Sequence, residues 1–369
     1  MRIAILWTHA SGYSAACWRA LQAIDGITVK VWAYSSNETT SNAPFDDALL
    51  LKEIDCVLLN DRQADDYQCL KRSVCAYRPD VVLVSGWNNR AYRKLMTSAD
   101  LKCGIKIMGM DNPWSGTWKQ YATCWLRSRY MKRFDYVWVA GERTRQFAKR
   151  ISRTTSIRDG VYSYDSNAFS GSLQKRELQA KDWPKRFLYV GRYVESKGLR
   201  QLFEAYDAYR ETVTDPWELH CCGAGPLEVL FDNRVGVRNL GFCQPRTLPN
   251  VFDSAGVFIL PSKYEPWGVV VAEAMAAGLP VIASDACGAT VELVRDNYNG
   301  FVFDPTDGAE LLERMLWCHD NRNRLFRLSE NAIASASAFS SGLWAERLVS
   351  IVRRNGIGQS VVASNACPL

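Results

Sequence analysis

The sequence predicts an α/β protein with two doubly wound, parallel-sheet domains. Short apolar runs typical of buried strands alternate with helix-length segments along the chain. This alternation is the pattern of a parallel sheet wrapped by helices. At 369 residues, 47% of them hydrophobic, the chain is long enough for two domains that each bury a core. We expect an N-terminal domain (1–170), a second domain (171–341), and a C-terminal helix that can cross back to the first domain, followed by a loose tail (342–369).

The apolar runs predict the positions of the strands in both halves of the chain. In the first half they are Ile3–Trp7, Thr28–Tyr34, Cys56–Leu59, Val81–Ser85, Ile105–Gly109 and Tyr136–Ala140. In the second half they are Phe187–Gly191, Trp217–Cys222, Val237–Gly241, Val257–Leu260 and Pro280–Ala283. Open parallel sheets bind ligands outside the carboxyl ends of their strands. We therefore expect functional residues in the turns that follow these runs.

The segment from Pro261 to Ser284 is the most informative part of the chain. A buried strand ends just before it, a turn rich in Pro and Gly follows, and Val269–Ala277 is then predicted to be a helix. Glu265 precedes this helix, whereas Glu273 lies inside it, ~7.5 Å along the axis from a helix start near Gly268. The free N–H groups at such a helix start attract phosphate or another anion. The two carboxylates and the helix start can therefore hold different parts of one extended ligand.

This segment resembles the E-x7-E motif of retaining, Leloir-type glycosyltransferases of the GT-B fold (group 1, family 4-like). The resemblance continues over further motifs in the order that the family has them, and these are Gly191–Gly198, Gly223–Pro226, Gly241–Cys243, Cys287–Glu292 and Asn299–Pro305. Together the motifs cover residues 186–305, whereas the first 150 residues match only weakly. The resemblance implies two Rossmann-like domains facing across a cleft. It also implies a nucleotide-diphosphate sugar as co-substrate, with no cofactor and no metal ion.

The resemblance also implies roles for residues on the donor side. Arg192 and Lys197 would neutralise the diphosphate, which also requires cations on chemical grounds because no metal motif is visible. Glu273 would accept both ribose hydroxyls, and Glu265 would hold hydroxyls of the donor sugar. Phe242 and Cys243 would contact the base. Four further positions would leave room for phosphate and hexose, and these are Gly268, Val269, Val270 and Gly288. The remaining implied donor-binding positions are Gly225 and Trp267.

The acceptor side departs from the family pattern. Relatives often have a Gly-Gly loop after the first strand, but here the loop has one glycine, and its candidate residues are His9, Ser11, Gly12 and Tyr13. Asp111 stands at or near the position of a histidine in the family's catalytic region. It is either a functional carboxylate, which we include among the catalytic candidates with Glu265, Arg192 and Lys197, or a cap on the following turn. The segment Asp159–Tyr162 is similar to the family's interdomain Asn-Gly-Val-Asp, with Asp replacing Asn and Tyr replacing Asp.

The positive charge of the chain lies in its first half. Residues 1–170 contain 24 Lys and Arg against 16 Asp and Glu, whereas the remainder contains 21 and 23. The excess is concentrated between 118 and 158, and aromatic residues interleave the predicted helix 118–133. A basic, aromatic helix docks on anionic membrane surfaces. The alternative is that the aromatic residues face the core and the charges form a solvated rim. Nucleic acid is a third partner class, and we expect none because no binding motif is present.

Cysteine and histidine usage predicts neither a disulfide framework nor a metal site. The 12 cysteines are scattered without a Cys-x-x-Cys, and none of the three histidines is at ligand spacing from another. Reduced core thiols in a cytoplasmic protein fit this usage. The N-terminal apolar run is too short for a signal peptide, and no run approaches the ~20 apolar residues of a membrane span. We expect a cytoplasmic protein, with peripheral association to the inner face of the membrane as a further expectation.

Three functions remain open at this point. The first is transfer of a sugar from a nucleotide sugar to a hydroxyl of a glycan or lipid-linked acceptor. The second is a nucleotide-sugar isomerase or phosphorylase on the same fold, and the third is a non-catalytic, membrane-associated protein that binds nucleotide sugars. A glycosidase is disfavoured because a retaining pair of carboxylates stands ~5 Å apart across one bond, whereas Glu265 and Glu273 flank a helix start beside cations.

Overall fold

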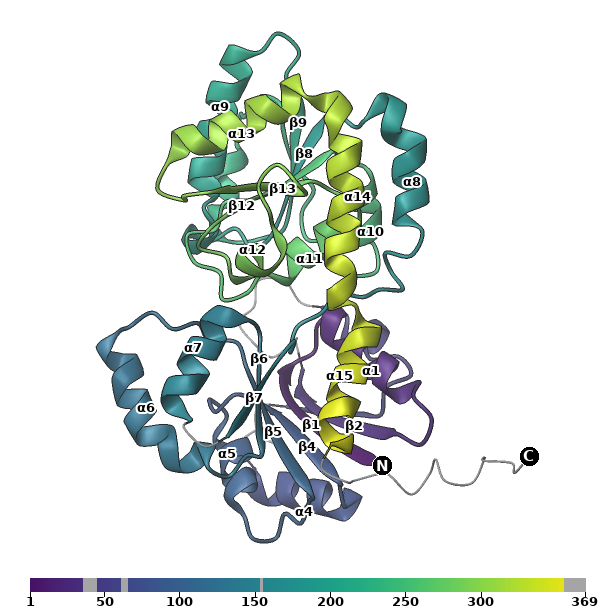
Figure 1. Cartoon of the computed structure of the whole chain (residues 1–369), viewed down its shortest axis with the longest axis vertical. Helices are drawn as coiled ribbons and strands as arrows, with labels where there is room; N and C mark the ends of the chain where they lie inside the picture. The colour runs from purple at the N-terminus through teal and green to yellow at the C-terminus, as the bar shows by residue number, and fades with distance from the viewer. Residues whose placement is uncertain (36–44, 61–65, 153–154, 355–369) are drawn as a thin grey trace, which may run out of the picture. The chain divides into compact units, whose positions relative to one another are not determined.

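The computed structural model describes residues 1–35, 45–60, 66–152 and 155–354, which form two compact units. Unit 1 comprises the described residues up to Ser163 and those from Ser341 onward (Figure 1). Unit 2 comprises Tyr164–Ser340. The boundaries between the units therefore lie between residues 163 and 164 and between residues 340 and 341. The sequence led us to expect them between 170 and 171 and between 341 and 342. The tail predicted to be loose, 355–369, lies outside the described residues.

Unit 1 contains a seven-stranded sheet in the order β3-β2-β1-β4-β5-β6-β7. Its neighbouring strands are all parallel. The strands are β1 (Arg2–His9), β2 (Thr28–Tyr34), β3 (Cys56–Leu59), β4 (Val81–Ser85), β5 (Ile105–Met110), β6 (Tyr136–Val139) and β7 (Ser156–Asp159). The first six confirm the predicted strands to within two residues at either end. The sequence did not predict β7, because this polar edge strand has no buried residue and therefore no apolar run.

Helices connect the strands of unit 1 and cover its sheet. They are α1 (Gly12–Gln22), α2 (Asp47–Leu50), α4 (Tyr67–Tyr77), α5 (Arg90–Thr97), α6 (Trp118–Met131) and α7 (Glu142–Ile151). The last helix, α15 (Ser341–Arg353), packs against α1. The Trp344 indole N–H donates to the carbonyl of Val161 at 2.9 Å, and its ring lies 4.9 Å from that of Trp138. The C-terminal helix therefore belongs to unit 1 although unit 2 precedes it in the chain.

Unit 2 contains a six-stranded parallel sheet in the order β10-β9-β8-β11-β12-β13. The strands are β8 (Arg186–Val190), β9 (Glu218–Cys222), β10 (Val237–Asn239), β11 (Val257–Leu260), β12 (Val281–Ser284) and β13 (Gly300–Phe303). The five predicted strands are confirmed, with ends that differ by at most two residues. The edge strand β13 was not predicted as a strand, although it lies within a motif of the resemblance.

The longer helices of unit 2 pack in two groups. The helices of this unit are α8 (Ser172–Gln179), α9 (Leu199–Thr212), α10 (Leu248–Asp253), α11 (Val269–Ala276), α12 (Gly288–Leu293), α13 (Gly308–Asp320) and α14 (Leu325–Ala336). Helix α9 packs with α13, and α14 packs with α8 and α11 (Figure 1). The predicted helix over Val269–Ala277 is thus confirmed as α11. It carries Glu273 next to the buried core of the unit.

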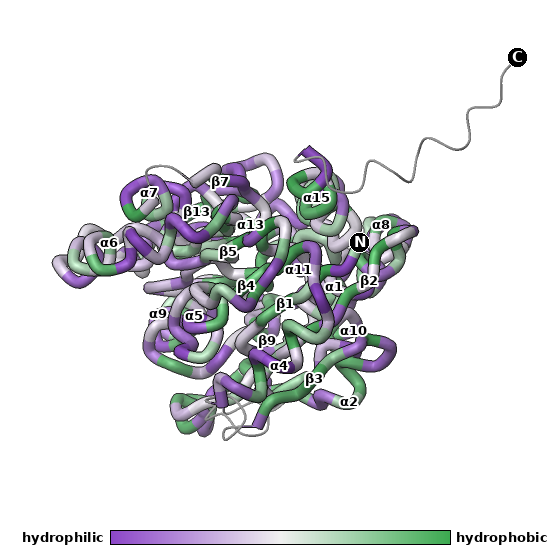
Figure 2. Tube along the Cα trace, turned by 90° about the horizontal axis from the view of Figure 1, so that it is seen from below, coloured by the Kyte–Doolittle hydropathy of each residue, from purple (hydrophilic) through white to green (hydrophobic). Residues whose placement is uncertain are grey.

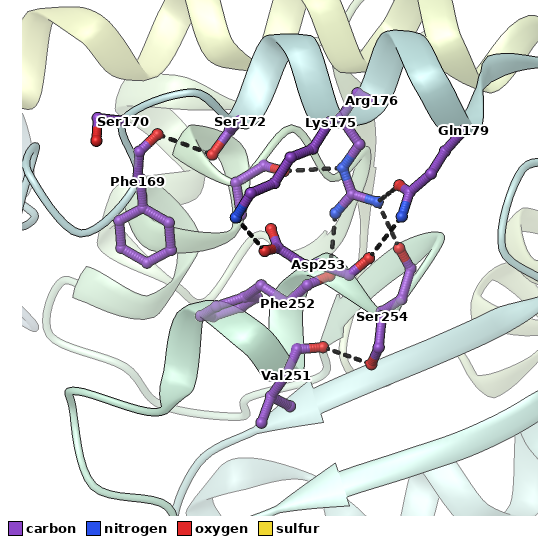
Figure 3. Close-up of polar contacts among 12 residues, drawn as sticks. Phe169, Ser170, Ser172, Lys175, Arg176, Gln179, Val251, Phe252, Asp253 and Ser254 are labelled. Carbon is purple, nitrogen blue, oxygen red and sulfur yellow. Dashed lines mark hydrogen bonds and ion pairs between the residues drawn. The ribbon is translucent and has the colours of Figure 1, made fainter.

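A buried guanidinium fastens α8 to the rest of unit 2 (Figure 3). Arg176 is 1% exposed, and its Nε donates to the carbonyl of Ala277 at 2.9 Å, at the end of α11. Its other nitrogens donate to the carbonyls of Ala255 (2.8 Å) and Phe252 (3.0 Å), at and just after the end of α10. Carbonyls at helix ends have no partner within the helix, so these bonds satisfy them. Burial lowers the pKa of Arg176 to about 10, which leaves it charged at neutral pH.

Each sheet reverses its strand order at one point. In unit 1 the reversal lies between β1 and β4, and in unit 2 it lies between β8 and β11. Strands that wind outward in opposite directions leave a crevice at their carboxyl ends, where open α/β sheets bind ligands. The topology therefore locates one candidate binding position in each unit. Among the described residues, no helix is long and apolar enough to span a membrane.

Candidate active site

Five loops meet at the carboxyl edge of the sheet of unit 2. They follow β8 to β12, and together they contain all the residues predicted for the donor side except those inside α11 and Gly288, which begins α12. Backbone hydrogen bonds join neighbouring loops: Gly191 to Cys222 (3.0 Å), Tyr193 to Ala224 (2.8 Å), Gly223 to Gly241 (2.8 Å), Tyr264 to Ser196 (3.2 Å) and Gly288 to Glu265 (3.1 Å). The loops after β8 and β11 lie at the reversal of strand order. The predicted donor-side residues thus gather where the topology places a ligand.

Two cations and a carboxylate lie at the reversal point. Lys197 forms an ion pair with Glu265, and the two side chains are 13% and 12% exposed. Burial and the nearby guanidinium of Arg192 lower the pKa of Lys197 to about 8, while a smaller contribution from Cys287 acts in the opposite direction. Arg192 is exposed, and no carboxylate of the described residues forms an ion pair with it. An anion bound between the two cations would relieve their mutual repulsion.

The turn into α11 is packed too closely for side chains larger than glycine. Gly268 has φ +93°, and a Cβ there would lie 2.7 Å from the sulfur of Cys287. A Cβ on Gly288 would lie 2.3 Å from the carbonyl oxygen of Pro266. The carbonyl of the buried Trp267 accepts the Cys287 thiol at 2.9 Å, which ties the two turns together. The close packing brings backbone, rather than side chains, to the surface of the site.

Helix α11 presents a polar start and a carboxylate one turn later. Val269 and Val270 form its first turn, where backbone N–H groups have no partner within the helix. Glu273 is partly exposed, and no group of the described residues donates a hydrogen bond to its carboxylate. Burial, with a smaller contribution from Asp165, raises the pKa of Glu273 to about 7. A ligand that offers hydroxyl donors would stabilise the charged form of this side chain.

The loops after β9 and β10 form the far end of the same edge. Gly225, Phe242 and Cys243 are all partly exposed there. The thiols of Cys222 and Cys243 hydrogen-bond, and burial followed by this contact raises the pKa of Cys222 to about 12. The described cysteines are all free, and no group of His, Cys, Asp or Glu side chains in the described part of the chain is arranged to hold a metal ion.

Unit 1 has a cavity of about 390 Å³ at its own reversal point. Of the residues predicted for the acceptor side and the catalytic centre, His9, Ser11, Tyr13 and Asp111 line it, whereas Gly12 begins α1 and does not. The hydroxyl of Tyr162 donates to Asp111 Oδ2 at 2.7 Å. No backbone N–H of the described residues donates to this carboxylate. The interpretation of Asp111 as a turn cap therefore has no support in the structure.

Sequence reasoning missed several residues that line these two positions. Trp7, Trp87 and Tyr162 line the cavity of unit 1, and Asp165 acts on Glu273 in unit 2. Trp87 lies in the turn that follows the predicted strand Val81–Ser85. Ligands of open parallel sheets bind beside such turns, so Trp87 could have been identified by examining this turn as well. Tyr162 lay in a segment noted for its similarity to the family, but its contact with Asp111 spans 51 positions. No local pattern reveals such a contact.

The basic helix α6 exposes much of its aromatic surface. Trp118, Trp125 and Leu126 are 74%, 79% and 64% exposed, whereas Tyr130 and Phe134 are buried. Figure 2 shows hydrophilic and hydrophobic residues interleaved along this helix. Thus the first part of the helix presents aromatic rings outward, and its end anchors it to the core. The interpretation that the aromatic residues face the core therefore holds for the end of this segment, and docking of the exposed part on a membrane surface stays a prediction.

Comparison with known proteins identifies the family of the second half of the chain. Residues 172–335 match the family described as Glycosyl transferases group 1. This part of the chain belongs to the group 1 glycosyl transferases. Among curated relatives, the Alpha-D-kanosaminyltransferase of Streptomyces kanamyceticus is 27% identical over 57% of this chain and 56% of its own length. The chain spans between 15% and 56% of the lengths of the first three curated relatives that it matches.

Solved structures extend the likeness to both halves of the chain. The sucrose-phosphate synthase of Thermosynechococcus elongatus has a TM-score of 0.74 at 18% identity, over 96% of this chain and 98% of that one. The Anabaena Alr3699/HepE structure, in complex with UDP and glucose, has a TM-score of 0.72 at 17% identity, over 96% and 100%. At these identities the likeness shows the fold, which is GT-B. The group 1 family and the GT-B fold of two parallel-sheet domains, both predicted from the sequence, are confirmed, and the retaining mechanism stays a prediction.

Proposed function

We propose that this protein is a retaining glycosyltransferase. It transfers a sugar from a nucleoside-diphosphate sugar to a hydroxyl of a glycan or lipid-linked acceptor, without a resident metal ion or cofactor. The observation on which this proposal rests is the arrangement of Arg192, Lys197 and Glu265 beside the start of α11 at the reversal point of unit 2. Membership of residues 172–335 in the group 1 glycosyl transferases and the UDP complex of a protein with the same fold support it.

The charge of the site matches the chemistry of a diphosphate leaving group. Departure of a nucleoside diphosphate leaves negative charge on phosphate oxygens, and fixed cations and N–H groups stabilise that charge as it develops. Arg192 and Lys197 supply the cations, and the first turn of α11 supplies N–H groups. Since Lys197 also contacts Glu265, it bridges the diphosphate position and the position proposed for the donor sugar.

The two carboxylates hold opposite ends of the donor. Glu273 lies further along α11, where its carboxylate has no donor among the described residues and can accept the ribose hydroxyls. Glu265 accepts hydroxyls of the donor sugar, and the resemblance further implies that the sugar is displaced from its front face with the leaving phosphate assisting. In that reaction the acceptor hydroxyl attacks the anomeric carbon, the bond to the diphosphate oxygen breaks, and the acceptor's proton passes to the phosphate.

Helix α6 supports a lipid-linked acceptor. Its exposed Trp118 and Trp125 belong to a helix in which Lys119, Arg127 and Arg129 face no acidic residue of the same helix. Exposed rings insert at the headgroup level of a membrane, and basic side chains are attracted by anionic lipids. The proposed partner of this helix is therefore an anionic membrane surface on which the acceptor is presented.

A panel of nucleotides tests the proposed function. Thermal unfolding in the presence of UDP, GDP, ADP and their nucleosides is expected to show stabilisation by at least one diphosphate, since a ligand that binds the native state raises stability by RT ln(1+[L]/Kd). The matching nucleotide sugar is then incubated with candidate acceptors, and the anomeric configuration of the product is read by NMR. Stabilisation without turnover would indicate a binding protein. Turnover without an acceptor would indicate an isomerase, and inversion at the anomeric carbon would contradict the proposed stereochemistry.

A further inference from the structure

The cavity of unit 1 has the size and position of a binding site for a small molecule. Its volume of about 390 Å³ lies within the roughly 300–1,000 Å³ that such pockets occupy. It opens where the loops after β1 and β4 diverge, at the reversal of strand order. Trp7 and Trp87 contribute aromatic surface to its wall, and Asn88 and Ser11 contribute polar groups. Aromatic surface beside a few polar groups suits a molecule with both apolar and hydroxyl faces.

The carboxylate of Asp111 is held in place with one oxygen available. Tyr162 donates to Oδ2 at 2.7 Å, and Thr144 donates its hydroxyl to the Asp111 carbonyl at 3.0 Å. No other donor among the described residues contacts the carboxylate. Asp111 is therefore fixed through both its side chain and its main chain, and Oδ1 can accept a hydrogen bond from a ligand.

Tyr162 is itself fixed by its surroundings. Its ring meets that of Tyr13 edge to face with centroids 5.3 Å apart, and the two side chains also hydrogen-bond. Burial raises the pKa of Tyr162 well above its usual value, and the neighbouring Tyr13 and Asp111 add to this shift. The hydroxyl therefore keeps its proton and donates it to the carboxylate. Tyr162 acts through Asp111 and is a positioning residue.

The cavity holds negative charge without a compensating cation. No Lys or Arg of the described residues lines it. Burial lowers the pKa of His9, against a smaller opposing contribution from Asp47, which favours the neutral form of this ring. A phosphate or carboxylate on a ligand would meet Asp111 without a counter-charge, whereas a hydroxyl or an ammonium group would find an acceptor.

We propose that this cavity receives the terminal unit of the acceptor and selects an uncharged or amino-bearing sugar over a phosphorylated one, with Asp111, positioned by Tyr162, as the selecting residue. The assignment of this ligand as the acceptor rests on the proposed glycosyltransferase function. Selection by charge is a property of the cavity and is measured without a donor.

The test compares sugars that differ in charge and little else. Binding of glucose, glucosamine and glucose 6-phosphate to the full-length protein is measured by saturation-transfer NMR and calorimetry. Glucose and glucosamine are expected to bind more tightly than the phosphate ester. In Asp111→Asn the affinity for glucosamine is expected to fall roughly tenfold to a hundredfold, because a hydrogen bond to a charged group is lost. The difference between the affinities for glucose and glucose 6-phosphate should also become smaller. Tyr162→Phe produces a smaller change in the same direction, with no effect on binding of the diphosphate found in the nucleotide panel.

Matched controls separate the outcomes. Asp25→Asn removes an exposed carboxylate of unit 1 outside the cavity and should leave all three affinities unchanged. Thermal unfolding and binding of the diphosphate found in the nucleotide panel verify that each variant is folded. Tighter binding of glucose 6-phosphate, unchanged selectivity in Asp111→Asn, or no binding of glucose and glucosamine up to their solubility would each overturn the inference. If a nucleoside diphosphate binds while the sugar preference fails, the proposed function stands without the inference. If the sugar preference is observed while no nucleotide binds, the selection by charge stands and the proposed glycosyltransferase function fails.

Discussion

The carboxyl edges of the two sheets occupy the same topological position and differ in chemistry. In unit 2 the loops at the reversal point bring Arg192 and Lys197 together with Glu265 and the start of α11. In unit 1 the equivalent position holds Asp111 with no Lys or Arg of the described residues along the cavity wall. The sheet topology thus determines where a ligand can bind, and the residues of the loops determine which ligand charge the position favours.

The net charge of a region does not predict the charge of its site. Residues 1–170 have the basic excess of the chain, yet none of the basic residues lines the cavity of unit 1. Several of them lie instead on α6, beside exposed Trp118 and Trp125. Residues 171–369 are slightly acidic, yet unit 2 has the cationic position. Composition therefore describes the outer surface of each unit, and the loops must be examined separately.

The largest expected effect tests the cationic edge. Lys197→Ala is expected to lower the rate of sugar transfer ~100- to 1,000-fold, because a fixed charge aimed at the leaving group contributes mainly in the transition state. The measurement is kcat with the donor found in the nucleotide panel. Lys181→Ala, an exposed lysine of unit 2 that precedes the sheet, is the matched control. Equal rates in the two variants would remove Lys197 from the site.

A second change asks whether the anion is the diphosphate. Arg192→Ala is expected to weaken binding of the nucleoside diphosphate roughly tenfold to a hundredfold, because a charged hydrogen bond to phosphate is lost. Binding of the corresponding nucleoside should stay the same. Calorimetry with both ligands measures the two losses. Should both ligands lose affinity equally, the guanidinium contacts another part of the donor or acts through the fold.

A third prediction concerns how the Glu273 carboxylate in unit 2 affects the stability of the folded protein. The pKa of Glu273 is raised from 4.5 to about 7 in the folded protein, so the folded state loses stability as pH rises from the lower value through the higher. Glu273→Gln removes this effect and is expected to stabilise the protein at pH 8 by at most about 3 kcal/mol, with no gain near pH 4. The variant should also bind the nucleotide more weakly, because its amide accepts the ribose hydroxyls less strongly than a carboxylate.

Urea unfolding at several pH values measures the Glu273 effect. Asp165→Asn is the companion variant, since it removes a charge that raises the same pKa and should recover a smaller part of the stability. A constant difference between Glu273→Gln and the parent across this pH range would show that the carboxylate does not titrate as described.

The smallest expected effect tests the outer surface of unit 1. The protein should co-sediment with anionic vesicles at low salt and dissociate as salt shortens the screening length to ~8 Å. Each basic residue near the surface contributes about 1 kcal/mol. Replacing Trp118 and Trp125 by Ser should weaken binding, whereas Leu178→Ser, which changes an apolar side chain of unit 2 that is 87% exposed, should not. Failure to bind anionic vesicles even at low salt would favour a soluble acceptor.

The sequence predicts most of the sheets and the donor-side loops because local patterns encode them. Strands such as Val257–Leu260 are short apolar runs buried on both faces, and the residues that follow them must reach the carboxyl edge. The edge strand Ser156–Asp159 lacks that pattern because solvent covers it. The hydrogen bond between Tyr162 and Asp111, and the outward direction of Trp118 and Trp125, depend on how distant elements pack. No single stretch of sequence records such packing.

Arg176 also decides where unit 2 must begin if it is transferred to another protein as a separate domain. The helix that bears this arginine comes before the first strand of the sheet, so a boundary drawn from the strands alone would discard it. Without it, the carbonyls of Phe252, Ala255 and Ala277 lose their shared donor. Ala277 caps the end of the helix that carries Glu273, so the damage would begin one turn from that residue. The match to the group 1 glycosyl transferases begins at residue 172, the first residue of the same helix.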